Sequence, residues 1–153
     1  MSTLRWSLVL LLILVGGAPP VAWGQASDSL AQASDSVEAT PAVAQRIAAA
    51  FTEGDANRLL TPSADRIEIS LFGARTFYSS AQALYVLREF FRSHAPRRFQ
   101  VRDVMETGTS CFVQGEYEQA RRARRLQVYV RLGQAEGADL WQLHEIRIEG
   151  PPK

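Results

Sequence analysis

The sequence is poor in the residues that most often build metal and redox sites. Its 153 residues include one cysteine, Cys111, and two histidines, His94 and His144. A single cysteine cannot form an intramolecular disulfide, and it cannot supply the paired thiolates of a structural zinc site. The two histidines show no metal-binding spacing, so we predict neither a metal nor a cofactor. Cys111 stands in an apolar strand pattern, which favours a small buried side chain over a reactive thiol.

The sequence also has little net charge. It contains 17 lysine and arginine residues against 16 aspartate and glutamate residues. Arg5 lies in a segment that we expect to be removed, which leaves the two signs balanced. A neutral protein has no global attraction to nucleic acid or to an anionic membrane, and no basic stripe interleaves aromatic residues here. We therefore predict no nucleic-acid partner.

The apolar run near the N-terminus is short. It covers Trp6–Val15, whereas a membrane-spanning helix takes about 20 apolar residues. Arg5 precedes the run, glycines and prolines break it, and Ala22–Gly24 offers the small residues that a signal peptidase recognises. Residues 1–24 are therefore predicted to be a secretory signal peptide, with a membrane anchor as the alternative. The mature protein would be periplasmic or extracellular, with no membrane span after cleavage.

The segment after the signal peptide has few apolar side chains. Residues 25–39 contain the tetrad Ala-Ser-Asp-Ser twice, and little in them could offset the entropy of ordering. We interpret this segment as a flexible linker, with a heptad interaction helix as the alternative. Thr40-Pro41 is typical of a helix start. One folded domain is predicted over residues 40–150.

The clearest helix pattern lies within Tyr78–Pro96. Ser79 is a good N-cap, and Gln82 stands where its side chain completes a capping box. Pro96 cannot continue the helix. Apolar residues and one histidine share a face at helical spacing, namely Ala83, Leu84, Leu87, Phe90, Phe91 and His94. This face must be buried against another layer.

The rest of the domain is predicted to form two short helices and six strands. The helices come first, after Thr40 and after Asp55, and are separated by Gly54. The strands are expected at Arg66–Phe72, Arg75–Tyr78, Phe99–Glu106, Cys111–Gln119, Arg124–Leu132 and Leu140–Ile148. This order predicts an α+β fold, in which a curved antiparallel sheet wraps over the long helix to make a cone with a mouth.

Several short stretches resemble a known group of proteins. They are Gly54-Asp55, Tyr78-Ser79, Ala81-Gln82, Leu87–Phe91, Pro96–Phe99, Arg125–Val130 and Gln142–Glu149. Together they resemble a family of small secreted bacterial domains of unknown function, within the nuclear transport factor 2-like superfamily. That superfamily is also called cystatin-like and includes ketosteroid isomerases and SnoaL-type cyclases. The resemblance implies the cone fold and export, but it implies no particular chemistry.

The interior of such a cone suggests a pocket. If alternation holds, Asp103, Tyr117 and His144 point inward together, and a buried carboxylate could act as a general base. The resemblance implies a comparable use of carboxylates and tyrosine in isomerases of this fold. An apolar ligand pocket is expected from Leu87, Phe90, Phe91, Phe99 and Met105. The alternative is an exposed Asp103, a packed Tyr117 and a hydrogen-bonded His144, because a β-bulge would turn any of them outward.

The strongest local charge feature is a cluster of arginines at a strand turn, formed by Arg121, Arg122, Arg124 and Arg125. With Arg97 and Arg98 it could bind an anion or an acidic partner. Alternatively, Glu116 and Glu118 pair with it across the strands, and the turn is a solvated tip.

Three functions remain open at this point. The favoured one is a non-enzymatic domain that binds a small apolar ligand or a protein partner, at the cone mouth or on the outer face around Trp141. A homodimer through the outer sheet face is one form of this hypothesis. The second is an isomerase or dehydratase that uses Asp103, Tyr117 and His144. The third is an accessory subunit whose arginine turn docks an acidic partner.

Overall fold

The computed structural model describes residues 42–135 and 137–151. The predicted signal peptide (residues 1–24) and linker (residues 25–39) lie outside the described residues, as does the start of the predicted domain. Within the described part of the chain, no helix has the length and hydrophobicity that a membrane-spanning helix needs.

The first helices form as the sequence predicts. A helix over residues 42–53 buries Ala44, Ile47, Ala50 and Phe51, and ends at Gly54, whose positive φ of 68° suits a left-handed stop. Helix α2 (Ala56–Leu60) follows, and the carboxylate of Asp55 accepts a hydrogen bond from the amide of Arg58 at 3.0 Å.

Helix α3 (Ser80–Ser93) confirms the predicted capping box. The hydroxyl of Ser79 accepts from the amide of Gln82 at 3.3 Å, and the side chain of Gln82 accepts from the amide of Ser79 at 3.0 Å. The helix ends at His94, whose amide donates to the Phe90 carbonyl at 2.8 Å. Its buried face is the predicted one, with Ala83, Leu87, Phe90 and Phe91 in the core.

Six strands form one sheet in the order β2-β1-β6-β5-β4-β3. Their bounds are β1 (Ser63–Leu71), β2 (Ala74–Ser79), β3 (Pro96–Thr107), β4 (Ser110–Gln119), β5 (Arg125–Gly133) and β6 (Gln142–Glu149). All neighbours are antiparallel except β1 and β6, which run parallel. The sheet is therefore mixed, whereas the sequence alone predicted antiparallel pairing throughout.

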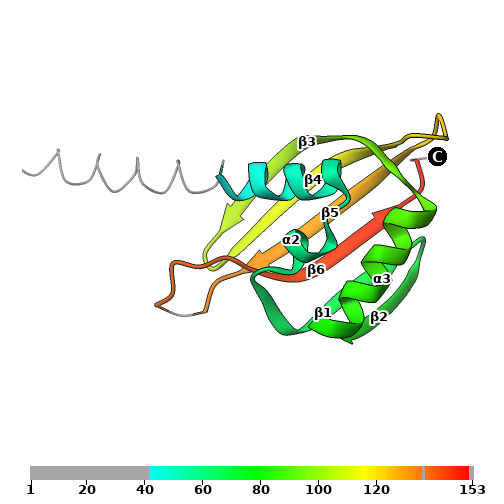
Figure 1. The fold of residues 1–153 in the computed structure, drawn as a ribbon. Helices are drawn as coiled ribbons and strands as arrows, with labels where there is room; N and C mark the ends of the chain where they lie inside the picture. The colour runs from blue at the N-terminus through cyan, green and yellow to red at the C-terminus, as the bar shows by residue number, and fades with distance from the viewer. Residues whose placement is uncertain (1–41, 136, 152–153) are drawn as a thin grey trace, which may run out of the picture.

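The helices and the sheet form two layers. The helix over residues 42–53, α2 and α3 all lie on one face of the curved sheet (Figure 1). Alternate residues of the strands meet them, such as Cys111, Val113 and Tyr117 on β4 and Leu126, Val128 and Val130 on β5. We call this the inner face. The other, outer face of the sheet carries no helix among the described residues.

Candidate functional site

Aromatic rings fill the inner side of the cone. Phe51 stacks on Phe99 with ring centroids 4.8 Å apart, and meets Phe91 and Tyr117 edge-on at 5.9 and 6.1 Å. Phe90 packs against Phe91 at 5.5 Å. Four of the residues predicted to line a ligand pocket, Leu87, Phe90, Phe91 and Phe99, are therefore packed against one another as core. At this place the structure shows packed side chains where the sequence predicted a pocket.

The fifth predicted pocket residue, Met105, lies on the outer face and is 54% exposed. Strand β3 has a bulge between Val101 and Asp103, where two of its residues oppose a single step of β4. The bulge reverses the alternation, so that Val101 points inward while Asp103 and Met105 point outward. The prediction that Asp103 and Met105 point into the cone was wrong for this reason.

The bulge also separates two of the predicted acid–base residues. Asp103 pairs with Gln114 on the outer face and is exposed, whereas Tyr117 is fully buried on the inner face. The phenol of Tyr117 donates a hydrogen bond to the carbonyl oxygen of His94, at the end of α3. Burial raises the pKa of this phenol above its ordinary value. Tyr117 thus ties a helix end to the sheet and does not meet Asp103.

The third residue, His144, sits at another irregularity. Between Leu143 and Glu145 the register of β6 against β5 shifts, because Leu143 pairs with Leu132 while Glu145 pairs with Arg131. The imidazole packs over Gly133, where a β-carbon would lie 2.9 Å from Nε2. Burial and the nearby charge of Arg131 lower the pKa of His144. The predicted convergence of Asp103, Tyr117 and His144 is therefore absent.

The four arginines of the turn are all exposed, and one of them, Arg125, makes ion pairs. Arg125 makes ion pairs with Glu116 at 3.2 Å and with Glu118 at 3.3 Å, which is the cross-strand pairing that the sequence offered as an alternative. Arg102 joins the same group through Glu116 at 2.7 Å, and this contact lowers the pKa of the Glu116 carboxyl. Arg121, Arg122 and Arg124 are exposed.

Trp141 does not form an outer binding patch. It is 5% exposed and belongs to the core, and its carbonyl accepts a hydrogen bond from Arg46 at 3.4 Å. The adjacent Leu140 is the exposed residue of the pair, at 55%. The outer-face binding surface expected around Trp141 is therefore not formed by this side chain.

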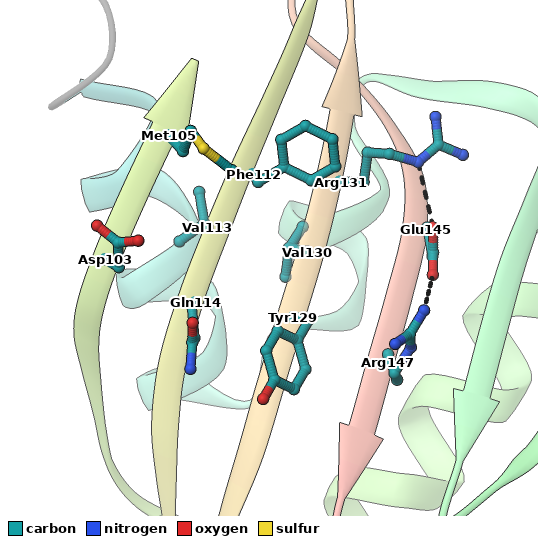
Figure 2. Close-up of a pocket in the computed structure, with 10 residues that line it drawn as sticks. All are labelled: Asp103, Met105, Phe112, Val113, Gln114, Tyr129, Val130, Arg131, Glu145 and Arg147. Carbon is teal, nitrogen blue, oxygen red and sulfur yellow. Dashed lines mark hydrogen bonds and ion pairs between the residues drawn. The ribbon is translucent and has the colours of Figure 1, made fainter. Parts of the chain in front are cut away.

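The outer face carries a hollow of about 250 Å³ over β3, β4, β5 and β6 (Figure 2). Its apolar part is formed by Met105, Phe112 and Tyr129, all of which are at least partly exposed. Asp103 lies on its β3 side, and Arg131, Glu145 and Arg147 lie on its β5 and β6 side. The hollow is thus apolar in the middle and charged at two opposite edges.

The charged edge on β5 and β6 is a chain of three side chains. Glu145 accepts from Nε of Arg131 and from Nη2 of Arg147, each at 3.1 Å (Figure 2). Burial alone would raise the pKa of Glu145, but the two arginines outweigh it and lower the pKa below the usual range. Glu145 is therefore ionised at neutral pH. Arg147 also lies over the ring of Tyr129 at 6.0 Å.

The hollow was not predicted, although the pattern of residues in two strands indicates it. In β4 and β5 the strict alternation that buries Val113 and Val130 necessarily sends Phe112 and Tyr129 to the opposite face. Two aromatic residues on a solvent face are uncommon enough to mark a contact surface. The position of Asp103 and Met105 beside the hollow could not be predicted from alternation, because it depends on the bulge in β3.

Residues 44–149 match the model of a family described as a domain of unknown function, DUF4783. The match covers more than half of the chain. This chain belongs to the DUF4783 family. The predicted resemblance to a family of domains of unknown function is confirmed, as is the α+β fold.

Solved structures agree with this assignment. A DUF4783 protein from Bacteroides ovatus is 21% identical over 71% of this chain and 94% of its own, with a TM-score of 0.64. One from Bacteroides uniformis is 21% identical over 71% and 97%, also with a TM-score of 0.64. A nuclear transport factor 2-like protein of unknown function from Silicibacter pomeroyi has a TM-score of 0.53 at 16% identity, over 78% and 98%. These likenesses show the fold. No curated protein matches the chain.

The described part of this DUF4783 domain holds no group of three or more histidine, cysteine, aspartate or glutamate side chains arranged to bind a metal ion. Cys111 is buried, and burial together with the charge of Glu106 raises the pKa of its thiol. A thiol with a raised pKa is a weak nucleophile at neutral pH.

Proposed function

We propose that this DUF4783 protein is an exported, non-catalytic binding domain that binds protein through the outer face of its sheet, and that its partner there is a second copy of the chain. Export rests on the predicted signal peptide. The observation that carries the binding proposal is one row of outer-face residues whose two ends have opposite charge.

The row crosses four strands in register. Asp103 on β3 pairs with Gln114 on β4, Gln114 pairs with Tyr129 on β5, and Tyr129 pairs with Arg147 on β6. At about 4.8 Å between neighbouring strands, the acidic and basic ends lie roughly 14 Å apart. The polar and aromatic residues between them carry no charge.

Such a row is complementary to itself. A two-fold axis that runs along the strands between β4 and β5 would lay β3 of one copy over β6 of the other. Asp103 of each copy would then face Arg147 of its partner, and the contact would occur twice. The neighbouring row, Phe112 with Arg131, would bring the ring of one copy over the guanidinium of the other.

The exposure of the apolar side chains supports the same surface. Met105 is 54% exposed and Phe112 is 38% exposed, and both border the hollow. Covering them with another sheet would remove apolar area from water, at about 25 cal/mol per Å² buried. Two sheets packed face to face in this way are about 10 Å apart, which leaves room for these side chains to interdigitate.

Catalysis is not proposed, because Asp103 and Tyr117 lie on opposite faces of the sheet. In addition, the phenol of Tyr117 donates its hydrogen bond to the carbonyl oxygen of His94. The interior ligand pocket is not proposed either, because aromatic rings occupy that space.

Sedimentation velocity of residues 25–153 over a range of concentrations tests the proposal. We expect a dimer, and we expect Phe112→Arg to shift it to monomer, because the new guanidinium would face Arg131 of the other copy and this contact between like charges would occur twice. Tyr85→Arg is the matched control, since Tyr85 is 71% exposed on α3 and lies away from the hollow. A wild-type chain that stays monomeric at high concentration, or equal effects of the two variants, would refute the proposal.

A further inference from the structure

Gln119, at the end of β4, is a buried polar residue with one side-chain hydrogen-bond acceptor that no described residue satisfies. It is 6% exposed, and its side-chain Nε2 donates to the Arg124 carbonyl at 3.2 Å. Its other amide atom, Oε1, is buried and accepts no hydrogen bond from any described residue. A buried acceptor without a donor is unfavourable, and a bound group that donates a hydrogen bond to it removes this penalty.

Gln119 forms part of the wall of a hollow of about 150 Å³. The hollow lies where α3 ends, β4 turns into β5 and the C-terminal segment passes by (Figure 1). Arg122 and Arg124 line it from the turn, and Leu126 and His94 line it from the inner face and from the end of α3. Two arginines of the turn thus line an opening that also has apolar walls, which is a suitable surround for an anion with an apolar body.

Phe72 and His94 line both this hollow and a second, open groove of about 430 Å³. Phe72 has a positive φ of 52°, which is unusual for a bulky residue, and the residue is 51% exposed. The ring lies 5.4 Å from that of His94, and the groove beyond it is lined by Leu71, Val86 and Phe90. The backbone at Phe72 therefore holds an aromatic ring at the border of a charged and an apolar compartment.

We propose that this end of the cone binds a small organic acid that carries a hydroxyl or amino group next to its carboxylate and an apolar side chain. Arg122 and Arg124 pair with the carboxylate. The neighbouring O–H or N–H donates to Oε1 of Gln119, and the apolar side chain lies along Phe72 toward the groove. The site does not depend on self-association, because none of these residues belongs to the outer-face rows.

Three related probes test the chemistry on the wild-type protein by ¹H–¹⁵N NMR titration. 3-Phenyllactate has the acid, the hydroxyl and the ring; 3-phenylpropionate lacks the hydroxyl; methyl 3-phenyllactate lacks the charge. We expect 3-phenyllactate to bind at least about fivefold more tightly than 3-phenylpropionate, and at least about tenfold more tightly than the ester. The shifted amides should include residues 72, 94 and 119–126. Equal affinity for the two acids, or no saturable shifts up to roughly 10 mM, would overturn the proposal.

Variants then separate a built site from general attraction to the arginine turn. Arg122→Gln should weaken 3-phenyllactate about tenfold. Arg121→Gln is the matched control, because Arg121 is an exposed residue of the same turn that does not line the hollow. Gln119→Met, which keeps the side-chain length, should abolish the preference for 3-phenyllactate over 3-phenylpropionate. Equal weakening by Arg121→Gln and Arg122→Gln would contradict the assignment.

Discussion

The ring of Phe99 on β3 lies directly against the backbone of Gly115 on β4. A β-carbon built on Gly115 would be 2.3 Å from Cζ of Phe99 and 2.8 Å from the carbonyl oxygen of Gln100. The ring can stack on Phe51, at 4.8 Å, only because this position has no side chain. The aromatic filling of the cone therefore depends on one glycine.

Gly115→Ala is expected to lower the free energy of unfolding by about 1–3 kcal/mol, because Phe99 must leave its place between β4 and Phe51. Gly150→Ala is the control, since nothing lies within 4 Å of a β-carbon at that position, and its effect should stay within about 0.5 kcal/mol. Urea unfolding of both variants makes the comparison. Equal stability of the two would mean that the ring is not confined by Gly115.

The ionisation of Tyr117 makes the free energy of unfolding depend on pH in the alkaline range. Its pKa is raised in the folded protein, so above the ordinary phenol pKa of about 10 the unfolded chain loses this proton before the folded one does. The stability that Tyr117 contributes is thus complete below pH 10 and falls as the pH rises beyond it. Tyr117→Phe should cost about 1 kcal/mol at pH 8, through the lost hydrogen bond to His94.

Unfolding measurements between pH 8 and pH 11 test this account of Tyr117. The wild-type protein should lose stability above pH 10 more steeply than Tyr117→Phe does, so that the two curves approach each other. Parallel curves over the whole range would show that the phenol is not specially protected.

His144 makes the free energy of unfolding depend on pH in the acidic range. Burial and Arg131 lower its pKa below 6.5, so the unfolded chain takes up a proton first as the pH falls. The associated stability is complete above pH 6.5 and decreases below it, until the folded state also binds the proton. An NMR titration of the imidazole should give a midpoint below 6.5. Arg131→Gln should raise that midpoint only in part, since burial is the larger cause; an unchanged midpoint would exclude a contribution from Arg131.

The local elements could be predicted from the sequence because their signals are local. Ser79 and Gln82 fix the start of α3 through a capping box, and alternation along β4 and β5 shows which residues are buried. The parallel pairing of β1 with β6 was not predictable in this way, because it joins residues about 80 positions apart, such as Ile69 and Ile146.

The candidate site was harder to predict because it depends on irregularities. A bulge adds one residue, and that single residue reverses which face every later side chain occupies. In β3 it moved Asp103 and Met105 from the expected interior to the outer face, and in β6 it separated His144 from the inward positions of Leu143 and Ile146. No residue type at either position indicates a bulge. Regular alternation of inward and outward side chains was therefore assumed in both strands.

In the proposed dimer the outer face binds a second copy through Asp103 and Arg147, and mixing two variants tests this contact most directly. Asp103→Arg alone and Arg147→Asp alone should each be monomeric where the wild type is dimeric, with self-affinity at least about tenfold weaker, because like charges meet twice. An equimolar mixture should recover dimers in sedimentation velocity, since both contacts then join opposite charges. If the mixture stays monomeric while the wild type dimerises, or if each variant dimerises as well as the wild type, the Asp103–Arg147 contact is not part of the interface.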